Sequence, residues 1–154
     1  KRYRMKSFNL LLIISLSFFS ACNSIENSGA KESQSQSRIC PKCHMEVDKS
    51  NAHSASMVKN GTIYYFDDIG CLILWSHENK LDTKSAKVFT KDSARYIDAR
   101  HAHYKIGEKT PMSYGFVAFE NSVEDEIDFD EVSIRMLRGE HMANPKIRKQ
   151  ILGY

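Results

Sequence analysis

The sequence predicts an α+β fold, built as two small β-β-α units in tandem. The 154 residues suit one compact domain, and 42% of them are hydrophobic, which is too many for a disordered chain. A strong hairpin signal is followed directly by an apolar helical pattern. Phe66-Asp67-Asp68 also aligns with Phe119-Glu120-Asn121 at an offset of 53 residues, which indicates a weak internal repeat.

The N-terminal segment has the features of an export signal. Four basic residues precede an apolar run from Phe8 to Phe19, which is too short to span a bilayer stably. The run ends in Ser20-Ala21-Cys22, which resembles a bacterial lipobox. We therefore expect residues 1–21 to be a lipoprotein signal peptide and Cys22 to be lipidated. Position 23 directly follows the lipidated Cys. In a Gram-negative host, the absence of Asp there favours sorting of the lipoprotein to the outer membrane of the cell envelope, with the protein facing the periplasm.

The charge of the chain changes when the signal is removed. The sequence has 22 Lys and Arg against 19 Asp and Glu, for a net charge of +3. Four of the basic residues lie in the signal, so the mature chain carries 18 against 19 and gives no reason to expect nucleic-acid binding. Residues 22–38 are rich in Ser and Gln and predict a flexible tether, which leaves 39–154 as the folded domain.

The first unit begins with a predicted hairpin. Asn60-Gly61 separates the β-forming runs His53–Lys59 and Thr62–Phe66, as in a type I′ turn. Asp67 or Asp68 is then expected to cap an apolar helix that extends to about Asn79. A short strand is expected at Ala86–Thr90.

The second unit has a weaker pattern. Tyr96–Ile106 and Ser113–Phe119 are predicted strands, separated by a break at Lys109-Thr110-Pro111. Asp130–Gly139 has helical periodicity, and Pro145 is expected to open a final short helix.

The segment Cys40-Pro41-Lys42-Cys43-His44-Met45 contains four candidate metal ligands in six residues. Read literally, Cys-x-x-Cys-His is the attachment signature of c-type haem, with His44 as the proximal ligand and Met112 as the distal one. Export agrees with that interpretation, but the hairpin signals that follow do not agree with a mostly helical cytochrome.

Three other interpretations of the segment are open. A zinc site would need further ligands, and Cys71 stands alone in an apolar helix, where we expect a buried apolar role. A thioredoxin-like pair would need a helix after Cys43. A structural disulfide between Cys40 and Cys43 would close too short a loop to stabilise much.

The remaining interpretation is a soft-metal site. Thiolate and thioether sulfur select Cu(I) over harder metals. Cys43 and Met45 are two residues apart, so in an extended segment both side chains point to one side. Met112 lies at the predicted break before a strand, from where its sulfur could reach the site.

The pattern Cys40-Pro41-x-Cys43-x-Met45, followed by a strand, a Gly turn and Phe66-Asp67, resembles the NosL family. Asp98-Ala99, Pro111-Met112-Ser113-Tyr114-Gly115 and Ala118-Phe119 extend the resemblance in the same order, so that it covers about residues 38–120. NosL proteins are lipid-anchored copper proteins that assist assembly of the copper sites of nitrous-oxide reductase.

The resemblance implies two β-β-α-β-like lobes, at about 39–92 and 93–154. It also implies Cu(I) binding by Cys43, Met45 and Met112, and a copper-donating or copper-receiving partner in the reductase assembly machinery. From the chemistry of the motif, we expect Cys40 either to be a fourth contact or to shield Cys43 through a reversible disulfide. The family commonly has Gly at the position of His44, and the acidic stretch after residue 120 and the segment 131–154 depart from its pattern.

Other histidines are secondary candidates for metal contact. His44 belongs to the motif, His53 begins the first hairpin, and His103 alternates with His101 on a predicted strand, so that both should face one side. No phosphate loop, nucleophile elbow or His-Glu-x-x-His motif is present in the sequence. We therefore expect a metallochaperone and not an enzyme, with an exported c-type cytochrome as the alternative.

Overall fold

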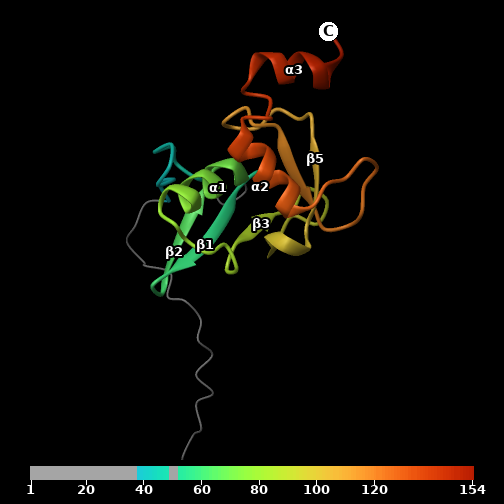
Figure 1. Ribbon diagram of the computed structural model, residues 1–154. Helices are drawn as coiled ribbons and strands as arrows, with labels where there is room; N and C mark the ends of the chain where they lie inside the picture. Colours follow the sequence, from blue (N-terminus) through green and yellow to red (C-terminus); the bar gives the residue numbers. More distant parts are fainter. Residues whose placement is uncertain (1–37, 49–51) are drawn as a thin grey trace, which may run out of the picture.

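The computed structural model describes residues 38–48 and 52–154, and it confirms the predicted α+β class (Figure 1). The described residues form a four-stranded antiparallel sheet, a two-stranded antiparallel sheet and three α-helices. The expected signal peptide, Cys22 and all of the tether except Arg38 lie outside the described residues.

The first sheet is built on the predicted hairpin. β1 (Ala55–Lys59) and β2 (Thr62–Phe66) pair antiparallel, and the turn residues Asn60 and Gly61 have φ of 51° and 76°. These are the positive values that a type I′ turn requires. β3 (Lys87–Phe89) and β4 (Tyr96–Asp98) complete the order β2-β1-β3-β4. Because β4 lies beyond residue 92, this sheet crosses the expected lobe boundary.

The expected strand Tyr96–Ile106 is interrupted in the structure. After β4, the side chain of Asp98 accepts a hydrogen bond from the N–H of Arg100 at 2.9 Å, and the chain makes a 3-10 turn at Ala99–His101. β5 (His103–Ile106) follows and pairs with β6 (Phe116–Phe119). The prediction that His101 and His103 alternate along one strand was therefore wrong, since His101 lies in the turn.

The helices begin at side-chain caps. α1 (Ile69–Glu78) is capped by Asp68, α2 (Phe129–Arg138) by Asp128, and α3 (Pro145–Leu152) by Asn144. In each case the cap side chain accepts a backbone N–H of the first turn, which satisfies a group that has no partner within the helix. The predicted helices near 69–79, 130–139 and after Pro145 are thus confirmed.

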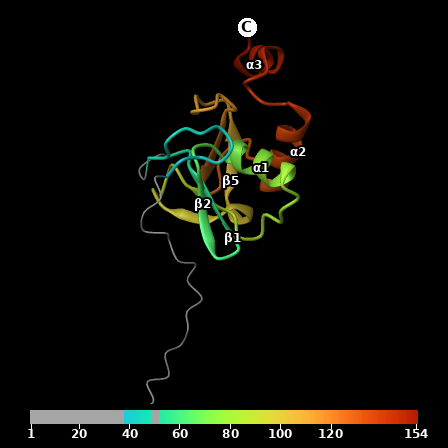
Figure 2. The same ribbon diagram turned by 90° about the vertical axis from the view of Figure 1, so that its left-hand side faces the viewer.

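One hydrophobic core joins the two units. α1 packs on the hairpin and against α2, as both views of the ribbon show (Figures 1 and 2). Gly70 permits the closest approach, because a Cβ there would lie 2.3 Å from a ring carbon of Tyr114 and 2.8 Å from the terminal methyl of Met136. The largest fully buried side chains come from both units and include Phe66, Leu72, Val88, Tyr104, Phe116 and Met136.

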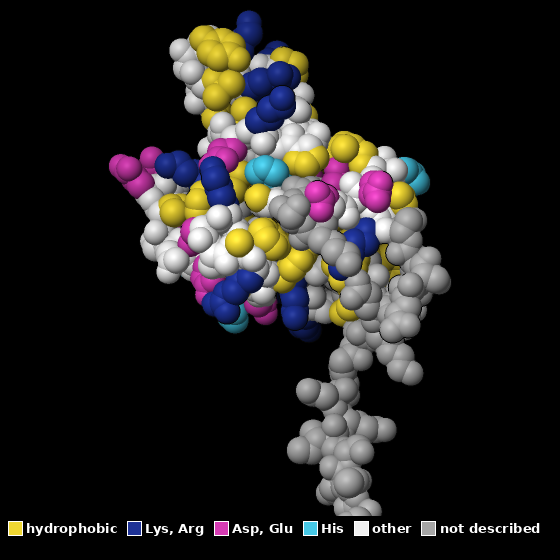
Figure 3. Space-filling view, turned by 180° about the vertical axis from the view of Figure 1, so that it is seen from behind, with side chains coloured by type: hydrophobic (Ala, Val, Ile, Leu, Met, Phe, Trp, Pro, Cys, Tyr) yellow, Lys and Arg dark blue, Asp and Glu magenta, His cyan; other side chains and the backbone are white. Residues whose placement is uncertain are grey.

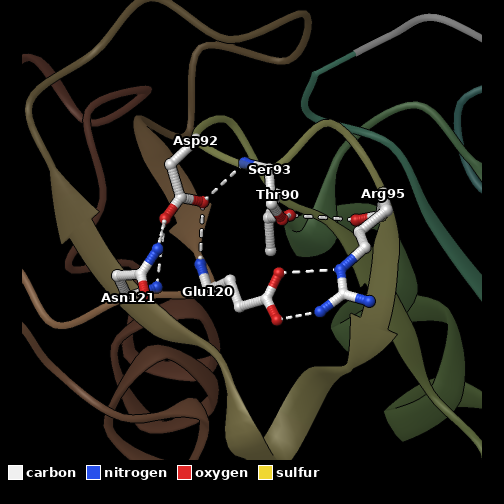
Figure 4. Close-up of polar contacts among 6 residues, drawn as sticks. All are labelled: Thr90, Asp92, Ser93, Arg95, Glu120 and Asn121. Atoms are coloured by element: carbon white, nitrogen blue, oxygen red, sulfur yellow. Dashed lines mark hydrogen bonds and ion pairs between the residues drawn. The ribbon is translucent and has the colours of Figure 1, made fainter.

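A polar network also connects the units (Figure 4). Asp92, in the β3–β4 loop, accepts the backbone N–H groups of Glu120 at 2.9 Å and Asn121 at 3.0 Å. Arg95 donates to both carboxylate oxygens of Glu120. Thr90 donates to the carbonyl of Arg95 at 3.0 Å, which tightens the same loop. The end of β6 is therefore held to the loop that precedes β4.

α3 projects from the body of the domain (Figures 1 and 2). It contains no buried residue, and Leu152 and Tyr154 at its end are 42% and 75% exposed. The projecting end shows Lys and Arg beside hydrophobic side chains (Figure 3). Within the described part of the chain, no helix combines the length and the apolar character that crossing a bilayer requires.

Candidate metal centre

Three cysteines and one aspartate form a compact cluster of possible metal ligands. One donor atom from each of Cys40, Cys43, Asp67 and Cys71 lies within 4.8 Å of the others. Cys40 and Cys43 come from a turn before β1, whereas Asp67 and Cys71 flank the N-terminal cap of α1. The cluster thus joins two segments that are well separated in the sequence.

The turn that carries Cys40 and Cys43 is held by its own backbone. The N–H of Cys40 donates to the carbonyl of Met45 at 2.8 Å, and the N–H of His44 donates to the carbonyl of Cys40 at 2.9 Å. His44 has a φ of 64°, a left-handed conformation that is strained for a residue with a Cβ. An antiparallel bridge between Ile39 and Glu46 closes the turn, so both thiols are presented by a fixed backbone.

The sulfur of Cys40 is surrounded by hydrogen-bond donors. The thiol of Cys71 and the backbone N–H groups of Cys43, Asp67 and Lys42 all point to it. The contact with Cys71 lowers the pKa of Cys40 most, whereas burial raises this pKa. The N–H groups lower the pKa further, so that it lies at about 6. Cys40 is therefore stabilised as a thiolate although its side chain is fully buried.

The other two sulfurs are stabilised as thiols. Cys43 Sγ donates to Asp67 Oδ1 at 3.0 Å, and burial together with this carboxylate raises the pKa of Cys43 to about 12. The hydrogen bond to Cys40, together with burial, raises the pKa of Cys71. These shifts favour the thiol form of Cys43 and Cys71, so binding of a metal by all three sulfurs as thiolates releases protons.

The spacing of the cluster fits a metal ion. Metal–thiolate bonds of about 2.3 Å in a tetrahedral site place two sulfurs roughly 3.8 Å apart. The four donor atoms already lie within 4.8 Å of one another, so a contraction of about 1 Å is sufficient. Three sulfurs and one carboxylate oxygen are a donor set for a thiophilic ion.

The loop that carries Met112 lies against the same end of α1. Asp68 is almost fully buried, and its carboxylate accepts the hydroxyl of Thr110 at 2.6 Å and the backbone N–H of Met112. Burial raises the pKa of Asp68 to about 6, while these donors oppose the shift. The Met112 side chain is half-buried against the core. The structure therefore brings Met112 to the helix end that carries Asp67 and Cys71.

The remaining predicted ligands have different surroundings. Met45 is 44% exposed at the edge of the turn, and its N–H points to the sulfur of Cys43. His44 is exposed next to it. Burial lowers the pKa of His53, whose charged neighbours are Glu108 and Lys91.

His103 also lies in a polar contact of its own. Its Nδ1 is 2.8 Å from Glu126 Oε1, and the pair bridges β5 and the acidic loop that precedes α2. His103 is therefore paired with an acidic side chain, and the charged groups that act on His53 are Glu108 and Lys91.

Sequence reasoning missed two members of the cluster. Cys71 is fully buried as expected, but its thiol faces Cys40, so the premise that it stands alone was wrong. Asp67 was expected as a possible helix cap and as part of the family pattern but not as a ligand, whereas Asp68 is the cap and Asp67 faces Cys43. Cys40, Cys43 and Cys71 are all free thiols, so the expected alternative of a Cys40–Cys43 disulfide is not observed.

No family model, curated protein or solved structure matches the chain. What the cluster can do chemically therefore follows from its donor atoms. Three sulfurs within reach of one ion are a donor set that could hold a thiophilic metal, and the adjacent carboxylate could serve as a fourth ligand or as a proton acceptor.

Proposed function

We propose that this protein is a metallochaperone that binds Cu(I) at the cluster and transfers it to a partner protein. The observation that carries the proposal is the convergence of Cys40, Cys43 and Cys71, with Asp67 beside them, within 4.8 Å. A carrier is favoured over a catalyst, because the described residues around the cluster are mainly soft ligands, and the one thiol–carboxylate pair, Cys43 and Asp67, lies within the metal site itself.

Cu(I) is favoured by the number and kind of the donors. Three thiol sulfurs complete a trigonal site, which suits a soft monovalent ion that needs few ligands. The fourth donor, Asp67, already accepts a hydrogen bond from Cys43 and is the hardest atom of the set. Met45 and Met112 would add neutral sulfur contacts from the edge of the turn and from the loop next to α1.

We further propose that the recipient belongs to the assembly machinery of nitrous-oxide reductase, and that the protein is an envelope lipoprotein anchored through Cys22. The resemblance to the NosL family supports this proposal. The backbone of His44 also supports it, because a φ of 64° is readily adopted by the glycine that the family commonly has there.

The alternative of a c-type cytochrome has less support from the geometry. Haem attachment requires thioether bonds from both Cys40 and Cys43 and ligation by His44. Cys40 is fully buried, and its sulfur already contacts the Cys71 thiol and three backbone N–H groups. Attachment of haem would require this packing to open.

Metal binding by the reduced protein tests the proposal. The full chain is titrated with Cu(I) in competition with the chromophoric ligand bathocuproine disulfonate, and in parallel with Zn(II). We expect about one tightly bound Cu(I) per chain, which Cys71→Ser weakens at least 100-fold. Stoichiometric binding of Zn(II) without binding of Cu(I) in these titrations would indicate a zinc site, and a Soret band in protein from its native envelope would indicate haem.

A further inference from the structure

The three cysteines of the cluster differ in their access to solvent. The side chains of Cys40 and Cys71 are both 0% exposed. Cys43 is only partly buried and packs at the margin of the core. An incoming ligand can therefore reach a bound ion from the side of Cys43 but not from the side of the other two sulfurs.

Cys40 and Cys71 are also the more firmly held ligands. Cys71 lies in the first turn of α1, next to the capped N-terminus, and Cys40 makes two backbone hydrogen bonds within its turn. Three backbone N–H groups point at the Cys40 sulfur. Displacement of the Cys71 thiolate from the metal would leave a charged group in the core without water to solvate it, whereas the donors around Cys40 hold its sulfur in position.

Cys43 has a partner ready to receive its sulfur when a metal bond breaks. Its Sγ lies 3.0 Å from Asp67 Oδ1, so the released side chain can return to that hydrogen bond as a thiol. The turn that carries Cys43 also presents two exposed apolar side chains, Ile39 at 43% and Met45 at 44%, which we call the rim. This rim is the apolar surface that the turn offers to another molecule.

We propose that Cys43 is the exchanging ligand of the metal site, whereas Cys40 and Cys71 are the anchoring ligands that release the ion last. This inference rests on the proposed function and specifies how the site passes on its cargo. The partner is a protein that presents a cysteine thiol within an apolar surface, which fits the rim formed by Ile39 and Met45.

The exchange step balances without any change of oxidation state. The incoming sulfur forms a bond to the metal, and the bond between the metal and Cys43 breaks. The proton of the incoming thiol passes to the Cys43 sulfur, which again donates to Asp67. A three-coordinate ion thus stays three-coordinate, and both electrons of each metal–sulfur bond remain on sulfur.

Rates of copper release from the full chain test the division of roles. Reduced protein loaded with one equivalent of Cu(I) is mixed with excess bathocuproine disulfonate, and formation of the coloured complex is followed by stopped flow. We expect Cys43→Ser to bind one Cu(I) and to release it at least tenfold faster than the wild type. We expect Cys40→Ser and Cys71→Ser not to retain one equivalent.

Folding and recognition need separate controls. Circular dichroism of the metal-free variants shows whether they fold, and Cys71→Ala replaces Cys71→Ser if the serine variant does not. The rim is tested by transfer to a peptide that carries Cys-x-x-Cys between apolar residues, compared with transfer to glutathione. We expect Ile39→Asp to slow transfer to the peptide at least threefold and to leave transfer to glutathione unchanged.

The outcomes separate the two proposals. A wild-type protein that binds no Cu(I) overturns the proposed function itself. A wild-type protein that binds Cu(I), together with a Cys43→Ser variant that loses it as completely as a folded Cys71 variant, overturns only the exchanging role of Cys43. Equal effects of Ile39→Asp on the peptide and on glutathione overturn the apolar protein surface as the partner.

Discussion

Thr110 Oγ1 donates to Asp68 Oδ2 at 2.6 Å and thereby connects the loop before β6 to the N-terminal cap of α1. The same hydroxyl accepts the N–H of Gly115 at 3.2 Å. The hydroxyl thus uses both its donor and an acceptor position within the core. Through this contact, the second half of the chain supports the helix end that presents Asp67 and Cys71.

Asp68→Asn changes the pH dependence of stability in the metal-free protein. Burial raises the pKa of Asp68 from 3.8 to about 6, so the wild-type folded state binds more protons than the unfolded state in this range. The stability that Asp68 contributes is fully present below pH 3.8 and is lost as the pH rises through about 6. Asp68→Asn should lower the free energy of unfolding relative to the wild type. We expect this difference to become smaller by about 1–3 kcal/mol between pH 4 and pH 8, as measured by urea unfolding.

A second variant checks that the effect arises from this contact. Thr110→Val removes a hydrogen bond that lowers the pKa of Asp68, so its destabilisation should be greater at pH 8 than at pH 4. If the loss of stability does not change with pH in either variant, the raised pKa of Asp68 and its contact with Thr110 are not the cause.

Gly70→Ala tests the contact between α1 and its neighbours. The added Cβ would lie 2.3 Å from Tyr114 Cδ2, and a ring cannot move as easily as the end of a flexible chain. We expect a loss of about 1–3 kcal/mol, even though Ala is the better helix former. Gln150→Ala, at an exposed position of α3, is the control and should change stability by less than about 0.5 kcal/mol.

Asp67→Asn should make the Cys43 thiol easier to ionise. After burial, the Asp67 carboxylate is the largest contribution that raises the pKa of Cys43 to about 12, and the neutral amide removes this contribution. The rate of alkylation of Cys43 by iodoacetamide, followed by peptide mass spectrometry as a function of pH, should therefore rise at lower pH than in the wild type. Glu46→Gln, on the exposed part of the same turn, should leave the profile unchanged.

Asp92→Ala tests the network between the β3–β4 loop and β6. The substitution removes the acceptor of two backbone N–H groups, and we expect it to cost about 1–2 kcal/mol because the site is exposed to solvent. Burial raises the pKa of Asp92, but the N–H groups of Glu120 and Asn121 outweigh burial and lower this pKa to about 2. The contribution of Asp92 should therefore be present above about pH 4 and lost as the pH falls toward 2.

His44→Gly should stabilise the metal-free protein. His44 has a φ of 64°, which is a left-handed conformation. This conformation destabilises the fold by roughly 1 kcal/mol for a residue with a Cβ. The gain is partly offset by the greater freedom of glycine in the unfolded chain, so we expect at most about 1 kcal/mol. Copper affinity should change less than twofold, because the side chain of His44 is exposed; a large loss would instead identify His44 as a ligand.

The local elements could be predicted because their signals are local. Asn60-Gly61 determines the hairpin turn, and the cap at Asp68 with the apolar pattern after it determines α1. The interruption at Ala99–His101 could not be predicted in the same way. The apolar alternation shifts from odd positions (Ile97, Ala99) to even ones (Ala102, Tyr104, Ile106) across it, but a β-bulge would give the same shift. The local bond from Arg100 to Asp98 fixes the turn instead.

The site could be predicted only in part. Cys40 and Cys43 lie in one motif, so their proximity follows from the sequence. Cys71 in an apolar helix has the same pattern whether it fills the core or binds a metal. Whether Cys71 can meet other donors depends on which segment packs over the first turn of α1, and that packing is a tertiary contact.

The position of the cluster gives a bound ion a mechanical role. Cys40 and Cys43 belong to the segment 38–48, which precedes the first strand, whereas Cys71 belongs to a helix at the centre of the domain. An ion bound by all three sulfurs would cross-link the segment 38–48 to helix α1. Loading and unloading would then change the resistance of that segment to proteases, so cleavage within residues 38–48 would report the cargo state without any spectroscopic signal from the metal.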